Sequence, residues 1–363
     1  MPVIVILAWT VWAMSQFMDG LLTHRSDPVA LMAEGGGIFL LMLGCVFAVV
    51  RHADRLAEFL REPYGTLVLT MSSTTIEATL MLRVMHHGAQ NPTLLRDTVF
   101  AVLMLSMNLM VGLALTAGAW RHREQSFKLR GALSFLQLIG SLCLLLLVLP
   151  NHTVSSQGAT LAIHQEAFLG LLSVVVYLLF LVLQTGRHRG YFDTSDESIS
   201  DRVATGAGPR PSLARVSWSV FGLLSALLPV VLLSEELGGA ISFGIEALDA
   251  PTALGGLVIA GLGLIPEGLG ALRAATANRI QRSVNICLGS ALSTIGLTVP
   301  TVLIAAAGLN LELVLGLDGT NSTLLQASLF VAVLTFVSGR ANALQGIIHL
   351  MLFLGYVMFI LFP

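Results

Sequence analysis

The sequence predicts an all-α membrane protein whose helices cross the bilayer many times. Of its 363 residues, 55% are hydrophobic and only 11% are charged, whereas a soluble protein carries about 25% charged residues. The mean hydropathy of +0.84 leaves too little polar surface to cover a globule of this size in water. These values disfavour a soluble enzyme, a nucleic-acid-binding protein and a disordered regulator.

Eleven apolar stretches are long enough to cross the hydrocarbon core as helices, which takes about 20 residues each. Their apolar runs are uninterrupted, without the alternation of polar and apolar residues that membrane β-strands show. The connections between them are short and leave no room for a separate water-soluble domain. The stretches are 2–22, 29–50, 64–85, 97–119, 130–150, 162–185, 214–234, 250–271, 282–307, 322–338 and 343–362.

One long hydrophilic segment divides the chain. Residues 186–213 are rich in Ser, Gly, Pro and mixed charge, which predicts a flexible cytoplasmic linker. Five predicted spans lie before it in 29–185 and five follow it in 214–363, while residues 1–28 hold one extra N-terminal helix. Because each half contains an odd number of spans, the two halves enter the membrane in opposite directions. This arrangement predicts two inverted five-helix repeats, which are common in secondary transporters.

The basic residues sort to one side of the membrane when the loops are assigned to alternate sides. Sixteen of the 19 Lys and Arg residues fall on one side, and only Arg25, Arg83 and Arg96 fall on the other. The positive-inside rule then predicts a cytoplasmic N-terminus and, with eleven spans, an external C-terminus. The predicted outer loops carry acids that are either solvated loop ends or a weak cation-attracting mouth: Asp19, Asp27, Glu166, Glu235, Glu236, Glu246, Asp249, Glu312 and Asp318.

The two halves share a faint pattern that supports the repeat. Each half places a glutamate inside an apolar helix, then a loop with an arginine, then a helix rich in small residues. The offset of 186 residues that relates Arg96 to Arg282 also pairs Asn108 with Thr294. The segments are EPYGTLVLTMSSTTIEATLMLR with RDTVFAVLMLSMNLMVGLAL, and ALGGLVIAGLGLIPEGLGALRAA with RSVNICLGSALSTIGLTVP.

Glu77 and Glu267 are acidic residues that lie inside predicted spans. An ionised side chain at the centre of the bilayer costs at least ~2.5 kcal/mol, so such residues usually face a cavity or a partner. One interpretation is a protonated glutamate that joins two helices by a hydrogen bond. The other is a carboxylate that binds a transported cation. Matching positions in the two halves favour the second interpretation.

Oxygen-bearing residues near the two glutamates predict a site for a hard cation such as Ca²⁺, which binds six to eight oxygens. Ser73 and Thr74 lie four and three residues before Glu77, on the same helix face. Small polar residues on the following helices equally suit close helix packing or complete the ligand shell: Asn108, Ser290, Ser293 and Thr294. Beside Glu267, Pro266 removes a backbone N–H and Gly263 lets the chain bend, which predicts a helix break.

The remaining polar residues inside predicted spans carry weaker signals. Glu34 lies nearer the outer end of its span, where it lines an entrance or caps a helix. His349 inside the last span is a packing residue or a proton carrier, and packing is the simpler interpretation. Three cysteines stand far apart in apolar stretches, a spacing that suits neither a disulfide framework nor a metal site: Cys45, Cys143 and Cys287. The sequence holds no nucleotide-binding or hydrolase motif, so neither a cofactor nor an enzyme activity is expected.

Several segments, in order, resemble the ChaA-type calcium/proton antiporters of bacteria, in the cation/proton exchanger branch of the cation/calcium exchanger superfamily. The resemblance runs from about Val49 to Pro363. It is weak in the first span and in the linker, whose four acids are fewer than the family's linker carries. The segments are VVRHADRLAEFLREPYGTLVLT, PTLLRDTVFAVLM, IPEGLGALRAA, GSALSTIGLTVP and SGRANALQGIIHL.

The resemblance implies ten core helices in two inverted repeats, one extra N-terminal helix, and a bacterial inner membrane location. It also implies that Glu77 and Glu267 bind the cation and the protons. The family's asparagine on the next helix falls on Asn108, and Thr294 replaces it in the second half. The wider branch has Gly-Asn four and three residues before each glutamate; this chain has Ser73–Thr74 and Gly263–Leu264 instead. ChaA-type members share that departure and are associated with Na⁺ and K⁺ as well as Ca²⁺.

The function that these observations predict is export of a cytoplasmic cation in exchange for protons. The expected partners are inorganic cations, protons and the lipid bilayer, with no nucleic acid; the oligomeric state is left open. Three alternatives remain: the same exchange acting chiefly on Na⁺ or K⁺, an intramembrane enzyme with two carboxylates, and a passive channel. An enzyme of that kind needs a motif such as GxGD, which the sequence lacks, and a channel would conduct without a proton gradient.

Overall fold

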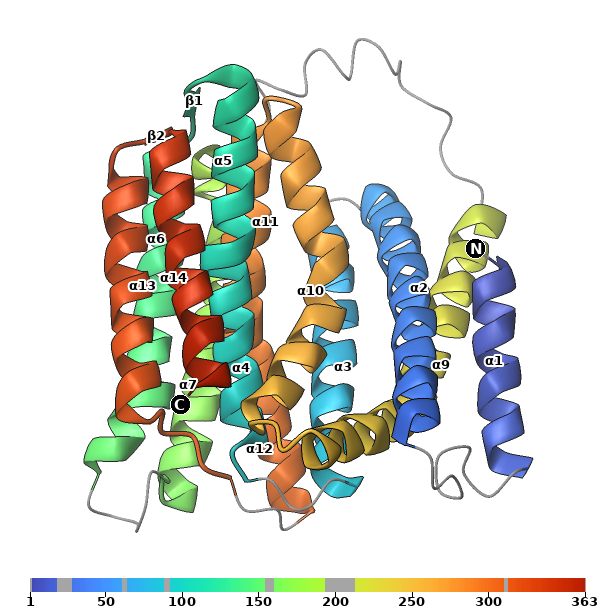
Figure 1. Ribbon diagram of the computed structural model, residues 1–363. Helices are drawn as coiled ribbons and strands as arrows, with labels where there is room; N and C mark the ends of the chain where they lie inside the picture. Colours follow the sequence, from blue (N-terminus) through green and yellow to red (C-terminus); the bar gives the residue numbers. More distant parts are fainter. Residues whose placement is uncertain are drawn as a thin grey trace. The chain divides into compact units, whose positions relative to one another are not determined.

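The protein is described by a computed structural model that covers residues 2–17, 28–60, 64–87, 92–153, 160–192, 213–309 and 313–362. Within these ranges the chain forms eleven continuous helices (Figure 1). Eight are α1 (Pro2–Phe17), α2 (Pro28–Leu60), α3 (Tyr64–His87), α7 (Ile163–Thr185), α9 (Leu213–Ala247), α10 (Ala253–Thr276), α13 (Gly319–Val337) and α14 (Ala343–Leu361).

The other three helices contain segments of π-helix. The first runs through α4 (Leu94–Met104), η1 (Leu105–Met110) and α5 (Val111–His122). The second runs through α6 (Leu129–Cys143), η2 (Leu144–Val148) and η3 (Leu149–His152), the last of these a 3₁₀ turn. The third runs through α11 (Ile280–Ser293), η5 (Thr294–Thr298) and α12 (Val299–Gly308). Each π segment inserts a wider turn into a helix that continues on both sides.

Nine helices in the described part of the chain are long and apolar enough to cross a membrane. The remaining two are α1, which has 16 residues, and α3, which has a polar centre around Glu77. The prediction of a helical protein that crosses the membrane many times is therefore confirmed. The inverted relation of the two halves stays a prediction.

Two predicted boundaries were wrong, because charged residues were assigned to loops. α2 continues to Leu60, well past residue 50, and α9 continues to Ala247, well past residue 234. Three acids assigned to an outer loop therefore lie within α9: Glu235, Glu236 and Glu246. Glu235 forms an ion pair with Arg83 of α3, with 3.3 Å between Oε2 and Nη1. An acid with such a partner is tolerated within an otherwise apolar helix.

α10 also differs from its prediction, because it is one uninterrupted helix of 24 residues with Pro266 inside it. The predicted break at Gly263 and Pro266 is therefore absent. A proline removes a single backbone hydrogen bond, and membrane helices tolerate this where neighbouring groups satisfy the freed carbonyl.

The described chain groups into two compact units, and the first is built mainly from α1, α2, α3 and α9. It comprises Met1–Thr98, Pro211–Pro266 and Ala305–Glu312. α2 packs against α1, α3 and α9. At Gly35 a methyl group would lie 2.6 Å from Cβ of Ala240, so α2 and α9 approach as closely as two helices can. Small residues at helix contacts are the usual means of association within lipid.

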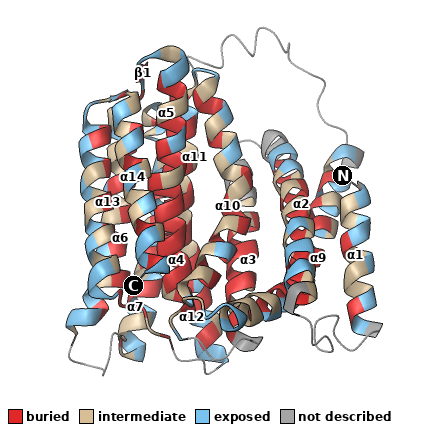
Figure 2. Cartoon of the chain, in the orientation of Figure 1, coloured by how far each residue is buried: buried red, intermediate tan, exposed pale blue. Residues whose placement is uncertain are grey.

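The second unit comprises Val99–Arg210, Glu267–Ile304 and Leu313–Pro363. It contains most of the two most buried helices, Leu94–His122 and Ile280–Gly308, which we call the first and second buried helix. In their most apolar windows 89% and 78% of residues are buried, against 22–44% in the other candidate spans; the red ribbon of α4, α5 and α11 in Figure 2 follows this burial. The surrounding helices expose large apolar side chains, as lipid contact requires.

A two-stranded antiparallel sheet joins two loops of the second unit. Gln125 of β1 (Gln125–Ser126) pairs with Ala341 of β2 (Arg340–Ala341). Gln125 is 4% exposed and donates to the carbonyl oxygen of Ala275 and to Asn278 Oδ1, at 3.0 and 2.9 Å. These bonds tie the loop after α5 to the loop between α10 and α11.

The segment after α7 is held against the same unit. Phe192, at the end of the 3₁₀ turn η4 (Arg189–Tyr191), is buried against the rings of Phe135 and Phe180, with centroids 5.4 and 5.5 Å away. Asn285 Nδ2 of α11 donates to its carbonyl oxygen at 2.8 Å. The first residues of the predicted linker are thus anchored to α11, and residues 193–212 lie outside the described ranges.

Candidate functional site

Glu77 lies near the centre of α3 and is only 3% exposed. A methyl group at Gly263 of α10 would lie 3.5 Å from its Cγ and 3.8 Å from its Oε1. The carboxylate therefore lies directly against the backbone of α10, at a place where the partner helix has no side chain. A methyl group at this position would make ordinary van der Waals contact with the Glu77 side chain.

The hydroxyls around Glu77 on α3 are not equivalent. Ser72 and Thr75 donate to carbonyl oxygens four residues earlier, at 2.8 and 2.7 Å. In such bonds the hydroxyl proton is donated to the helix's own backbone. Thr74 is 5% exposed, and its Oγ1 has no hydrogen-bond partner among the described residues. Ser73 is half-buried. Thr74, three residues before Glu77, is therefore the buried hydroxyl with unused capacity to bind an ion or water.

Glu267 lies near the centre of α10, where it is half-buried. Ser290 of α11 donates its hydroxyl proton to Oε2 of Glu267. Ser293 and Thr294 donate to the carbonyl oxygen of Ser290, at 2.9 and 3.1 Å. The structure therefore brings Glu267 and Ser290 together as predicted, with the other two hydroxyls bonded to the turn that carries Ser290.

Asn108 is fully buried in η1, and both ends of its amide are hydrogen-bonded to other helices. Its Nδ2 donates to Ser328 Oγ of α13 at 2.9 Å. Its Oδ1 lies 3.1 Å from Nδ1 of His349 on α14. The other ring nitrogen of His349 lies 3.1 Å from Thr335 Oγ1 of α13. We call these four residues the Asn108 network; all are at most 4% exposed.

Asn108 and His349 stand out in the sequence, but neither their contact nor the two residues of α13 was predicted. His349 lies 241 residues from Asn108 along the chain, so periodicity within one helix gives no sign of the contact. One signal was present: Ser328 and Thr335 are seven residues apart, which places two polar side chains on the same face of an otherwise apolar helix.

Two of the three π segments coincide with residues paired by the proposed repeat. η1 contains Asn108, and η5 begins at Thr294. The two helices that contain them have the same length, 29 residues. The third segment, η2, has only Leu and Val. Because π segments expose backbone groups and frequently occur at functional sites, their position in the two buried helices supports a role for both regions.

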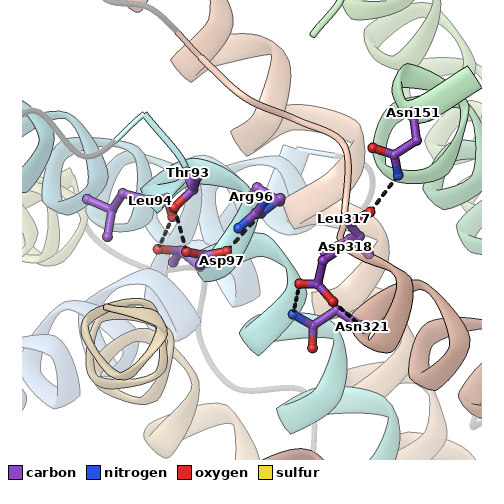
Figure 3. A network of polar contacts seen from close by, with 9 residues as sticks. Thr93, Leu94, Arg96, Asp97, Asn151, Leu317, Asp318 and Asn321 are labelled. Atoms are coloured by element: carbon purple, nitrogen blue, oxygen red, sulfur yellow. Dashed lines mark hydrogen bonds and ion pairs between the residues drawn. The ribbon is translucent and has the colours of Figure 1, made fainter. Parts of the chain in front are cut away.

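Asp97 marks the start of the first buried helix and is satisfied locally (Figure 3). Its Oδ2 accepts from Thr93 Oγ1 and its Oδ1 from Arg96 Nε, each at 2.8 Å. At Gly256 a methyl group would lie 2.8 Å from the backbone nitrogen of Thr98. These contacts fix the first turn of the helix against α10, which agrees with a structural role for Arg96 and Asp97.

Asp318 and Asn342 cap helices in the second unit. Asp318 Oδ1 accepts from the backbone N–H of Asn321 at 2.9 Å, and its Oδ2 accepts from Asn321 Nδ2 (Figure 3). Asn342 forms a reciprocal cap with Gln345 at the start of α14. Such caps satisfy backbone donors that a helix leaves unpaired. Glu34, in turn, is half-buried within α2 beside Gly35, while Asp19, Asp27 and Glu312 lie outside the described residues.

The family follows from comparison with known proteins. The model of the family described as sodium/calcium exchanger protein matches residues 36–186 and 218–362. The chain belongs to this exchanger family. The two matched stretches cover both halves of the sequence and leave out the region from 187 to 217, which contains the predicted linker. The expected resemblance to the cation/calcium exchanger superfamily is confirmed.

Relatives of this exchanger include bacterial proteins that match nearly end to end. The protein y4hA of Sinorhizobium fredii is 40% identical over 343 residues, which cover 94% of this chain and 91% of the relative. The sodium-potassium/proton antiporter ChaA of Escherichia coli is 33% identical over 357 residues, which cover 98% and 94%. The first of these relatives carries the name of a putative ionic transporter, and the second that of a sodium-potassium/proton antiporter.

Solved structures of exchangers share the fold. Native YfkE matches with a TM-score of 0.75 at 14% identity, covering 99% of each chain. The H⁺/Ca²⁺ exchanger CAX matches with a TM-score of 0.67 at 12% identity, covering 99% of this chain and 87% of the other. At this level of identity the likeness shows that the architecture is that of a polytopic exchanger.

The donor atoms at both glutamates are oxygens. In the described part of the exchanger, no three His, Cys, Asp or Glu side chains gather into a group that could hold a metal ion. Glu77 has the unpartnered hydroxyl of Thr74 on its own helix, and Glu267 has Ser290. Carboxylate and hydroxyl oxygens suit Ca²⁺ and alkali cations, whereas transition metals favour imidazole and thiolate. The three cysteines are buried and unpaired, in agreement with a packing role.

Proposed function

We propose that the protein is a secondary active antiporter that exports Ca²⁺ from the cytoplasm in exchange for external protons. Glu77 and Glu267 bind the cation and the protons in turn, near the midplane of the bacterial inner membrane. The orientation proposed from the basic residues has the N-terminus in the cytoplasm and the C-terminus outside. Under this proposal Thr74, Ser290 and backbone carbonyls contribute further oxygens.

The observation that carries the proposal is that α3 and α10, which have 24 residues each, both hold one glutamate near the centre with an oxygen donor close by. Glu77 of α3 lies against Gly263 of α10. Ser290 already donates a proton to Glu267. A structural role explains one buried glutamate well, but two of them at matching positions in helices of equal length favour ion binding.

The chemistry of a buried carboxylate explains why the process is an exchange. An ionised carboxylate without a counter-charge is strongly unfavourable in an interior that excludes water. A cation or a proton must therefore neutralise it before the site can close and reopen on the other side. Protons displace the cation on the outer side, where their activity is higher, and the cation reloads on the cytoplasmic side. Such a cycle uses the proton gradient and leaks neither ion.

Sodium and potassium are the second candidate cargo. The Escherichia coli relative, at 33% identity, carries the name of a sodium-potassium/proton antiporter. The positions four and three residues before each glutamate supply no amide oxygen, since they hold Ser73–Thr74 and Gly263–Leu264. With fewer strong oxygen ligands, a site has a weaker preference for Ca²⁺ over a monovalent ion.

The test uses purified protein in vesicles whose interior is acidic, with proton efflux followed after addition of CaCl₂, NaCl or KCl in turn. The wild-type protein is expected to release protons when its cation is added. Glu77→Gln and Glu267→Gln are each expected to reduce this release to the level of protein-free vesicles, because glutamine cannot exchange a proton for a cation. Glu166→Gln is the matched control, since Glu166 is a half-buried acid in the first turn of α7.

The panel of cations separates the two candidates. Release with CaCl₂ supports calcium export, and release with NaCl or KCl alone supports the monovalent alternative. Exchange that persists in either glutamine variant would remove that glutamate from the site. Cation flux that is independent of a proton gradient would instead identify a channel.

A further inference from the structure

The directions of the hydrogen bonds in the Asn108 network follow from one fixed acceptor. Ser328 lies 2.8 Å from the carbonyl oxygen of Leu324, which can only accept, so the Ser328 hydroxyl donates there. Its oxygen is then an acceptor for Asn108 Nδ2. The sulfur of Met104, 3.4 Å from the same Nδ2, is a second acceptor. The amide nitrogen of Asn108 therefore faces α13, and its oxygen faces His349.

The amide orientation in turn fixes the protonation of the imidazole. Because Asn108 Oδ1 accepts, Nδ1 of His349 carries the proton that it donates. The hydroxyl of Thr335 can then donate to the free lone pair on Nε2, at 3.1 Å. The four side chains of the network include no carboxylate, and His349 is fully buried. Since a buried charge without a counter-charge is costly, the ring is neutral, with each nitrogen engaged.

The helix that carries His349 is held firmly against the first buried helix. At Gly346 a methyl group would lie 2.6 Å from the backbone nitrogen of Thr116 and 2.8 Å from the carbonyl oxygen of Gly112. Further along α14, Tyr356 makes an edge-to-face contact with Phe100, with ring centroids 5.2 Å apart. These contacts on both sides of His349 leave the imidazole little freedom to move away from η1.

We propose that His349 is a positioning residue for transport. Its Nδ1–H holds the Asn108 carbonyl group in one orientation within η1 and thereby sets the apparent affinity for the cation. One lone pair of Asn108 Oδ1 is bound by His349, and the second is held in a defined direction. His349 itself does not carry the transported proton. This inference rests on the proposed antiport and on the sequence-based prediction that Asn108 contributes an oxygen to the cation site.

Two isosteres of histidine test the inference in the vesicle assay. The Nδ2 of an asparagine occupies the place of histidine Nδ1, whereas the Nε2 of a glutamine occupies the place of histidine Nε2. His349→Asn keeps the donor to Asn108 and is expected to retain the wild-type apparent KM and pH profile. His349→Gln loses that donor and is expected to raise the apparent KM for the cation about tenfold, the worth of one buried hydrogen bond, with a smaller change in maximal rate.

A second set of variants addresses the same amide from its other end. Ser328→Ala removes the acceptor of Asn108 Nδ2 and is expected to raise the apparent KM in the same direction as His349→Gln. Thr323→Val is the matched control on α13, because the exposed Thr323 donates to the carbonyl oxygen of Gly319 within its own helix. Folding of each variant is checked by size-exclusion chromatography. If a His349 variant does not fold, the apparent KM of Ser328→Ala tests the inference instead.

The outcomes distinguish this inference from the function on which it rests. Wild-type protein without cation-driven proton release would overturn both. Active wild-type protein with equal KM values for His349→Asn and His349→Gln would overturn the positioning role alone. A shifted pH profile or lost exchange in His349→Asn would identify His349 as a proton carrier, because asparagine preserves the hydrogen bond but cannot titrate.

Discussion

The two buried helices are alike in length and burial but differ in their attachments to their neighbours. Leu94–His122 and Ile280–Gly308 have equal length, the highest burial, and one π segment each. In the first, Asn108 extends from η1 to two residues of α13 and one of α14. In the second, the hydroxyls of Ser293 and Thr294 donate to a carbonyl oxygen of their own helix.

This difference follows from the chemistry of the residues at the paired positions. An amide has two N–H donors and a carbonyl oxygen, and a helix cannot satisfy them internally, so a buried asparagine needs partners from other helices. A threonine hydroxyl can donate to the backbone four residues earlier. Thr294, which the predicted repeat pairs with Asn108, therefore needs fewer polar residues on the surrounding helices. Two helices of equal length and similar burial can therefore differ in their side-chain connections.

The largest effect is expected where the first buried helix meets α14. Gly346→Ala would place its methyl group within 2.8 Å of backbone atoms of α5, and backbone cannot move aside, so we expect destabilisation of about 3 kcal/mol. Gly296→Ala, in the second buried helix, meets the side chain of Tyr177 at 2.9–3.1 Å and is expected to cost about 1 kcal/mol.

The measurement is unfolding of the purified protein in mixed micelles with increasing SDS. Gly355→Ala is the control on the same helix, because nothing lies within 4 Å of the added methyl group. A Gly346→Ala protein as stable as this control would show that α14 is not closely packed on the first buried helix.

A smaller effect is expected from loss of the Asn108 network. Asn108→Leu keeps the side-chain volume but removes the acceptor of His349 Nδ1 and the donor to Ser328, and unpaired buried groups cost about 1–3 kcal/mol. We expect destabilisation of about 2 kcal/mol in the same unfolding assay. In the double variant with Ser328→Ala the cost should be less than the sum of the two single costs, since both residues take part in one network. Strict additivity would argue that the bond between them contributes nothing.

The helices were largely predictable from the sequence, because long apolar runs have few alternatives in a chain with so few charges. The errors arose at polar residues that tertiary contacts make acceptable, such as Glu235 beside Arg83 and Pro266 within α10. The π segments at Asn108 and Thr294 were not predictable, since hydropathy does not distinguish a wide turn from an ordinary one.

At the candidate site, sequence identified the residue types but few of their contacts. Ser290 was predicted as one of four residues that either complete the ligand shell or pack helices closely, and the structure adds its hydrogen bond to Glu267. The close contact of Glu77 with Gly263 and the contact of His349 with Asn108 link segments far apart in the chain. Without a fold, nothing in the local pattern selects these partners over other polar residues.

The smallest effect is expected where the two buried helices are alike. Ser106 donates to the carbonyl oxygen of Val102 at 2.6 Å, and Ser293 donates to that of Ser290 at 2.9 Å, so each hydroxyl is satisfied within its own helix. Ser106→Ala and Ser293→Ala should each change the unfolding free energy by less than about 1 kcal/mol, because a hydroxyl bonded to its own helix contributes little. If both variants lose equally little unfolding free energy, the difference between the two helices comes from the hydrogen bonds that Asn108 makes with residues of α13 and α14. A much larger loss of unfolding free energy in either serine variant would show that the difference comes from hydrogen bonds within the helix itself.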